Sequence, residues 1–346
     1  MLKFFYSFLL LFGAVHSTAA RAESVLFLNP GTTEEAFWVS YSQFMQAAAT
    51  DLGIDLRILY SQRMPELTLA QARVALQGPG RPDYLVFVNE QYVAPQIIRL
   101  AEGLTANQMS LLGERPERLG SLVPNDEEGG YLMLKELIRQ HPPVAPGEVI
   151  ELLAFSGLKI TPSAQLREQG MLRALAEHPH VRLRQLVYSG WTRERAYEQA
   201  GLLFRRYPKV SLVWSANDEM AFGAMQAYSE TGGVPGKDAL FSAVNSSPTA
   251  LQALLDGRLS VLVGGHFTLG GWALVELHDL DQGVDLDHYG GRDRRIPLLQ
   301  LIDKAQARRL LAMGESPDYG VNFRRLSAKG RPTSYRYPFS LQTLMR

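Results

Sequence analysis

The stretch Trp214–Tyr228, WSANDEMAFGAMQAY, decides the fold of this chain because a strand ends in it and a helix begins in it. The residues up to Trp214, 210–214, are almost continuously apolar, as in a strand that is covered on both faces. From Glu219 onward the apolar residues follow helical spacing. Asn217 and Asp218 stand at the junction, where an amide or a carboxylate suits the start of a helix. The stretch therefore predicts one strand–helix unit of a parallel sheet.

The same alternation continues on both sides of this unit. Runs rich in Val, Leu and Phe predict strands, and segments with helical spacing predict helices between them. Strands are expected at residues 25–28, 55–60, 84–88, 149–155, 181–187, 210–214, 239–244 and 259–263, and helices at 34–52, 67–77, 94–102, 163–177, 193–207, 219–231, 249–255 and 269–280. This order predicts an α/β fold with doubly wound parallel sheets.

The N-terminus indicates export. Lys3 precedes an apolar run from Phe4 to Val15 that is too short to span a bilayer, and Ala20-Arg21-Ala22 has the small-x-small pattern of a cleavage site. We therefore predict a signal peptide at residues 1–22 and a soluble periplasmic protein. The chain contains no cysteine, which rules out a lipid anchor on cysteine, a disulfide framework and a thiolate metal site.

The charge balance argues against a nucleic-acid binder. The chain has 35 basic and 35 acidic residues, whereas proteins that bind nucleic acids carry an excess of basic residues on one face.

The residues that directly follow the predicted strands are rich in aromatic rings and amides. Ligands of doubly wound sheets bind beyond the carboxyl ends of the strands. Aromatic rings stack on the C–H faces of a polyol, and Asn and Arg form hydrogen bonds with its hydroxyls. Taken singly, such an aromatic more often packs in the core, an Asn more often caps a helix, and an Arg often forms a surface ion pair. Their shared position favours a binding site for a sugar-like ligand, with the candidate residues Phe37, Trp38, Asn89, Arg167, Trp191, Asn217, Asn245 and His266.

Three motifs, in this order, resemble the type I periplasmic sugar-binding proteins, a family that includes the ribose binders and the periplasmic autoinducer-2 receptor. They are QLREQG at Gln165–Gly170, ANDEMAFGA at Ala216–Ala224 and NSSPTALQAL at Asn245–Leu254. In addition, GSLVPNDEEGGY at Gly120–Tyr131 resembles the first crossing between the two lobes of that family. The resemblance implies two α/β lobes that are joined by three crossings and close on a ligand.

The resemblance also implies a division of the chain. The N-terminal lobe comprises residues 23–125 and about 266–298, and the C-terminal lobe comprises residues 126–265 and about 299–330. Residues 331–346 form a C-terminal tail. One strand of the first lobe has no counterpart near Gly103, because LAEGLTANQM continues from one predicted helix to the next.

The resemblance further implies roles for the candidate residues: Phe37, Trp38 and Trp191 match stacking aromatics, and Asn89, Arg167 and Asn217 match polar ligand contacts. Two positions depart from the family pattern. Asn245 stands where many sugar binders have an Asp, and an amide is a weaker acceptor than a carboxylate. Gly265 stands where ribose binders have a Gln, with His266 next to it. The departures argue against plain ribose as the ligand.

Together these features predict a periplasmic solute-binding protein that presents a sugar-like ligand to the membrane permease of an ABC importer. We expect a monomer that is not an enzyme and has no cofactor and no metal site.

Three alternatives belong to other classes. The first is a ligand-sensing receptor for a membrane sensor kinase or chemoreceptor. The second is a sugar-responsive repressor, which needs a DNA-binding headpiece where this chain has its apolar export segment. The third is a secreted hydrolase, for which Ser156 or Ser246 with His266 is the pairing to test.

Overall fold

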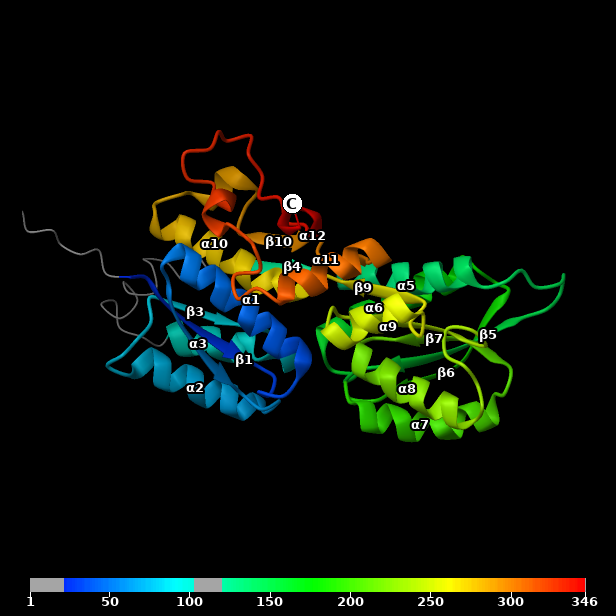
Figure 1. Ribbon diagram of the computed structural model, residues 1–346. Coiled ribbons are helices and arrows are strands. Elements are labelled where there is room, and N and C mark those ends of the chain that lie inside the picture. Colours follow the sequence, from blue (N-terminus) through cyan, green and yellow to red (C-terminus); the bar gives the residue numbers. More distant parts are fainter. Residues whose placement is uncertain (1–21, 103–119, 346) are drawn as a thin grey trace, which may run out of the picture.

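Two α/β lobes lie side by side in the computed structural model, which describes residues 22–102 and 120–345 (Figure 1). Each lobe has parallel strands between layers of helices, so the predicted fold class is confirmed. Residues 1–21 of the predicted signal peptide lie outside the described residues. So do residues 103–119, where one strand of the first lobe was predicted to have no counterpart.

The first lobe is built on a parallel sheet with the strand order β2-β1-β3. Its elements are β1 (Ser24–Asn29), α1 (Ala36–Leu52), β2 (Asp55–Tyr60), α2 (Pro65–Gln77), β3 (Tyr84–Phe87), η1 (Glu90–Tyr92) and α3 (Ala94–Glu102). Side chains of β1 alternate between two cores: Phe27 packs with α1, whereas Leu26 and Leu28 pack with α2 and α3. Helices therefore cover both faces of this sheet, as continuous apolar strands require.

The second lobe has a larger sheet with the strand order β11-β9-β8-β7-β5-β6. All its strands are parallel except the edge strand β11, which is antiparallel to β9. Its elements are α5 (Asp126–Gln140), β5 (Ile150–Ser156), α6 (Pro162–Ala176), β6 (Val181–Tyr188), α7 (Arg193–Arg206), β7 (Val210–Ser215), α8 (Asp218–Glu230), β8 (Leu240–Val244), α9 (Pro248–Asp256), β9 (Val261–Gly264) and β11 (Gln300–Leu301).

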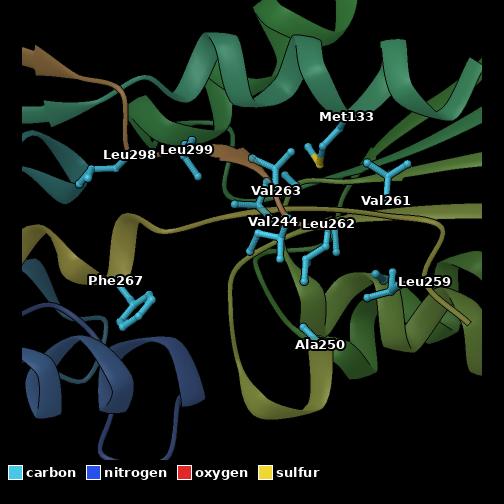
Figure 2. Packing of buried hydrophobic residues seen from close by; sticks show 14 of the residues in the cluster. Met133, Val244, Ala250, Leu259, Val261, Leu262, Val263, Phe267, Leu298 and Leu299 are labelled. Atoms are coloured by element: carbon cyan, nitrogen blue, oxygen red, sulfur yellow. The ribbon is translucent and has the colours of Figure 1, made fainter. Parts of the chain in front are cut away.

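The chain passes between the lobes three times. The first passage follows β4 (Ser121–Pro124), the second follows β9, and the third joins β10 (Asp293–Ile296) to β11, while β4 and β10 pair with each other. Asn125 ties the first passage to the third: its Nδ2 donates to the Leu299 carbonyl at 2.9 Å, and its Oδ1 accepts from the Leu299 amide at 2.8 Å. Figure 2 shows Leu299 close to the strands of the second lobe and Phe267 directed toward the helices of the first.

The second passage returns to the first lobe through η4 (His266–Thr268) and α10 (Leu269–Asp281), after which comes η5 (Leu286–Tyr289). Helix α10 packs on α1. Later, α11 (Lys304–Gly314) packs on α9 of the second lobe.

The C-terminal part of the chain returns to the first lobe. η6 (Phe323–Leu326) lies on α1, where the rings of Phe323 and Phe44 are 5.3 Å apart and the Phe323 amide donates to Asp51 at 2.6 Å. The prediction that residues 299–330 join the C-terminal lobe is therefore wrong from about Tyr319 onward, because these aromatic residues fill the outer face of α1. The predicted tail ends in α12 (Leu341–Leu344) and packs on α10, with the rings of Phe339 and Trp272 5.2 Å apart.

Within residues 22–102 and 120–345, no helix has both the length and the apolar character needed to cross a membrane.

Candidate ligand-binding site

Two glycines bring helices α5 and α6 into backbone contact and so place Arg167. A Cβ atom on Gly130 would lie 2.0 Å from the Arg167 carbonyl oxygen, and one on Gly170 would lie 1.8 Å from the Glu127 carbonyl oxygen. Only glycine fits at either position, because these distances are far below van der Waals contact. The close approach puts the Arg167 side chain beside Asp126, the first residue of α5.

The Arg167 guanidinium is buried and shared among three partners. Its Nε donates to Asp126 Oδ1 at 2.8 Å, its Nη1 donates to the Ala216 carbonyl at 2.7 Å, and its Nη2 lies 3.3 Å from His266 Nε2. Burial raises the pKa of Asp126, and the nearby Arg167 charge opposes that rise. Arg167 is only 5% exposed, so the alternative of a surface ion pair is wrong.

His266 links Arg167 to the first lobe. A guanidinium can only donate, so His266 Nε2 is the acceptor and the ring proton is on Nδ1. Burial, and after it the Arg167 charge, lowers the pKa of His266 well below its usual value. The ring stacks on Phe37 of α1 with 4.5 Å between centroids. Within the described residues Nδ1 has no hydrogen-bond partner although it is buried.

The tryptophans of the two lobes lie in matching settings. Trp191 follows β6 and covers Gly157, where a Cβ atom would be 2.1 Å from its ring; Trp38 covers Gly31 at the same distance. Each ring also has an arginine nearby, since Arg167 Cζ lies 5.7 Å from the Trp191 centroid and Arg63 Cζ lies 5.9 Å from that of Trp38. In the part of the chain that the structure describes, both buried indole Nε1–H groups lack a partner.

Asn217 serves the protein directly as a helix cap. Its Oδ1 accepts from the Met220 amide at 2.9 Å, which caps α8, and its Nδ2 donates to the Trp191 carbonyl at 3.0 Å. The residue therefore holds the Trp191 loop against the start of α8.

Asn245 is paired with Asp218 rather than free in the site. Its Nδ2 donates to Asp218 Oδ1 at 2.6 Å, and the Ser247 hydroxyl donates to Asp218 Oδ2. Burial raises the pKa of Asp218, and these two hydrogen bonds oppose the rise. At Asn245, where the resemblance expects a carboxylate, the structure thus has an amide held by the neighbouring carboxylate.

Asn89 forms no hydrogen bond with the other candidates in the described part of the chain. It is exposed, and its Oδ1 accepts from the Ala94 amide at 2.9 Å, so that it caps the start of α3. Phe37, Arg167, Trp191 and His266 instead form a continuous series of contacts from the first lobe to the second.

Sequence reasoning missed two residues at the edge of the first lobe, Arg63 and Tyr92. Arg63, in the loop after β2, forms ion pairs with Glu35 and Glu90. Tyr92, in the loop after β3, donates its hydroxyl hydrogen to Gln165 of the second lobe at 3.2 Å. A local signal for Arg63 exists, because it lies in the loop that follows a predicted strand, as the other candidate residues do.

Backbone strain marks the same edge. A positive φ is unfavourable for residues with a Cβ atom and is often retained at functional sites. Among the described residues this conformation occurs at six non-glycine positions, and five of them follow strands at the edge where the lobes meet: Gln62 (53°), Arg63 (61°), Tyr92 (60°), Trp191 (72°) and Asn245 (127°).

The pairings for a hydrolase do not form. The Ser156 hydroxyl donates to Glu168 at 2.6 Å, Ser246 Oγ accepts from the Gly265 amide at 3.1 Å, and no hydrogen bond joins either serine to His266 within residues 22–102 and 120–345. The same described ranges hold no group of three or more His, Asp or Glu side chains placed to bind a metal ion.

The arginines of the site are neutralised by the protein itself. Asp126 forms an ion pair with Arg167, and both Glu35 and Glu90 form ion pairs with Arg63, so each arginine has at least one carboxylate partner. The site combines these balanced charges with aromatic rings and the three buried N–H groups of Trp38, Trp191 and His266, which suit the oxygens of an uncharged polar ligand.

Comparison with known proteins gives concordant matches. The family described as "Periplasmic binding protein domain" matches residues 25–279. A crystal structure of a periplasmic sugar-binding protein from Pseudomonas fluorescens is 61% identical, with a TM-score of 0.87 over 93% of this chain and 99% of that chain. The ribose import binding protein of Escherichia coli (strain K12) is 24% identical over 257 residues, which are 72% of this chain and 82% of that protein.

More distant structures share the fold. An ABC transporter periplasmic solute binding protein from Actinobacillus succinogenes 130z with bound D-allose has a TM-score of 0.69 at 18% identity, over 83% of this chain and 99% of that one. Since the family match spans most of the chain and a relative at 61% identity covers nearly all of it, this chain belongs to the periplasmic binding protein domain family.

Proposed function

We propose that this protein binds a small, uncharged, sugar-like ligand between its lobes and presents it to the membrane permease of an ABC importer. The observation that carries the proposal is the series of contacts from Phe37 through His266 and Arg167 to Trp191, which joins both lobes at the carboxyl ends of their strands. The relatives named as sugar-binding and ribose import binding proteins support a sugar as ligand and a permease as partner.

Closure of the lobes is the proposed mechanism. Residues 23–125 and 266–298 move against residues 126–265, and a ligand that contacts both groups favours the closed arrangement by its differential affinity. Trp38 and Trp191 stack on the two faces of the ligand ring. His266 Nδ1 donates a hydrogen bond to one of its oxygens. The remaining predicted contacts, Asn89, Asn217 and Asn245, contribute through the loops that they hold.

The proposal includes export and a monomeric state. Cleavage before Glu23 would release the chain into the periplasm. Size-exclusion chromatography of the purified protein with light scattering should give the mass of one copy per particle.

Isothermal titration of residues 23–346 with a panel of pentoses and hexoses tests the function. We expect saturable binding of at least one sugar, and a loss of about tenfold or more in affinity in Trp191→Ala, because the stacked ring is removed. Tyr197→Ala removes an aromatic residue of α7 that instead pairs with Glu230, and its affinity should stay within about twofold of the original. Absence of binding across the whole panel would contradict the sugar class.

A further inference from the structure

The last 28 residues of the chain carry a charge that the rest does not. Residues 319–346 contain six basic side chains and no acidic one, whereas the whole chain has 35 of each. This segment also lies outside the matched range, residues 25–279, of the family to which the chain belongs. The basic segment therefore has a chemistry that the sugar site does not explain.

Part of this segment lines a cavity of about 740 Å³ on the outer face of the first lobe. Three cationic side chains come from the segment, and polar groups come from the end of α10: the lining residues are His278, Gln282, Arg324, Ser327, Lys329, Gly330 and Arg331. The volume lies in the range of about 300–1,000 Å³ that is usual for small-molecule sites.

The cations around this cavity are only partly compensated. Arg324 has Asp51 as a partner, but at 3.8 Å. Lys329 Nζ donates to Gln282, and Arg331 donates to the Arg325 carbonyl, both of which are uncharged. Two positive charges therefore face the cavity without a carboxylate partner in the described part of the chain, and an anion that enters would meet both at once.

The wall of the cavity is fixed by a buried carboxylate. Asp279 is fully buried and accepts hydrogen bonds from the Ser327 hydroxyl, the Ala328 amide at 2.6 Å and the Tyr337 hydroxyl at 2.6 Å. These bonds hold the loop that carries Lys329 on α10. Because the loop is already ordered, an anion would bind without the entropy cost of folding it.

We propose that this cavity is a second binding site, specific for a phosphate-type oxyanion, carried either by a free small molecule or by a lipid headgroup. Arg324 and Arg331 offer planar pairs of N–H donors, Lys329 offers a point charge, and Ser327 and Gln282 offer further hydrogen bonds to phosphate oxygens. The site is separate from the sugar site, so sugar binding serves as an internal control.

The experiment compares two triple variants with the same change in net charge. Arg324→Gln/Lys329→Gln/Arg331→Gln removes the cations of the cavity, and Arg182→Gln/Arg205→Gln/Lys209→Gln removes three exposed cations of the second lobe. Inorganic phosphate is titrated by calorimetry, and vesicles of phosphatidylglycerol or phosphatidylcholine are tested by co-sedimentation. We expect saturable binding that weakens about tenfold or more in the cavity variant and less than about twofold in the control, with a strong salt dependence.

The probes separate the two sources of the oxyanion. Binding of phosphate alone indicates a free phosphate-bearing ligand, and additional binding of phosphatidylglycerol but not phosphatidylcholine vesicles indicates a headgroup. The single variant Lys329→Gln keeps the test valid if the triple variant loses its fold. Equal losses in the cavity and control variants, or no saturable binding of phosphate or anionic vesicles, would overturn the proposal, whatever the result of the sugar titrations.

Discussion

Arg167→Ala should destabilise the whole protein, and not only weaken ligand binding. The substitution removes the partner of Asp126, a carboxylate that is only 4% exposed, and two further hydrogen bonds to Ala216 and His266. Breaking a buried ion pair by removing one partner costs about 3–5 kcal/mol, because the remaining charge stays buried and uncompensated. We therefore expect a loss of about 3–5 kcal/mol in the free energy of unfolding at neutral pH.

The matched control lies on the same helix. Arg173 of α6 pairs with Glu127 and Glu128, but its side chain is 43% exposed. Exposed pairs contribute about 0.2–1 kcal/mol, so Arg173→Ala should lose no more than that. Urea unfolding followed by circular dichroism measures both variants. If Arg167→Ala lost no more stability than Arg173→Ala, Arg167 would be a ligand contact only, and the reasoning from burial would be refuted.

The pH dependence of Arg167→Ala gives an independent check. Burial already raises the pKa of Asp126 above its usual 3.8, and removing Arg167 removes the main group that opposes the rise. The folded state then binds more protons than the unfolded state above pH 3.8, so stability must fall as pH rises. The deficit should be smaller at low pH than at pH 8, and Asp126→Asn in the same chain should restore part of it.

Three further predictions concern the supports of the site. Gly130→Ala should destabilise the protein by several kcal/mol in urea unfolding, because the new Cβ atom would lie 2.0 Å from the Arg167 carbonyl oxygen. Gly201→Ala on α7 is the control: its Cβ atom would have no atom within 4 Å, so the substitution should stabilise the protein by about 0.5–1 kcal/mol. Gly157→Ala should weaken sugar binding in calorimetry by displacing the Trp191 ring, whereas Gly314→Ala, which has open space, should not. Burial and the Arg167 charge hold the pKa of His266 well below 6.5 in the folded state, so the folded state binds fewer protons than the unfolded state and stability is lost as pH falls below 6.5. Melting temperatures at pH 4.5–7.5 should therefore show a weaker loss in His266→Gln than in the unsubstituted protein.

Local sequence patterns predicted most of the elements from β1 to α10, whereas β10, β11 and α11 were not predicted. The helix that begins after Asn217 was predicted from Glu219 to Thr231 and is found at Asp218–Glu230, because an amide cap and two acidic residues at a helix start are local signals. By contrast, the return of Phe323 to α1 was missed, since no local pattern shows which lobe a C-terminal aromatic residue will cover.

The site was predicted as a set of aromatic, amide and arginine residues at the carboxyl ends of the strands, and most of these residues do lie at that edge of the sheets. Phe37, Arg167, Trp191 and His266 are in contact, whereas Asn89 is exposed and bonds to the start of α3 instead. The sequence did not reveal that Asp126 neutralises Arg167, because the pairing depends on two helices that approach at Gly130 and Gly170. Whether these residues contact a ligand stays a prediction for the titrations described above.

The stretch WSANDEMAFGAMQAY shows where the division lies. By itself the sequence determined a strand, a capped helix and the edge on which Asn217 stands, since each depends on residues only a few positions apart. Only the tertiary structure decided that Asn217 holds the Trp191 loop, that Asp218 binds Asn245, and that Ala216 accepts a hydrogen bond from Arg167. Those partners are 26, 27 and 49 residues away in the chain, and what brings them together is the packing of helices on a shared sheet.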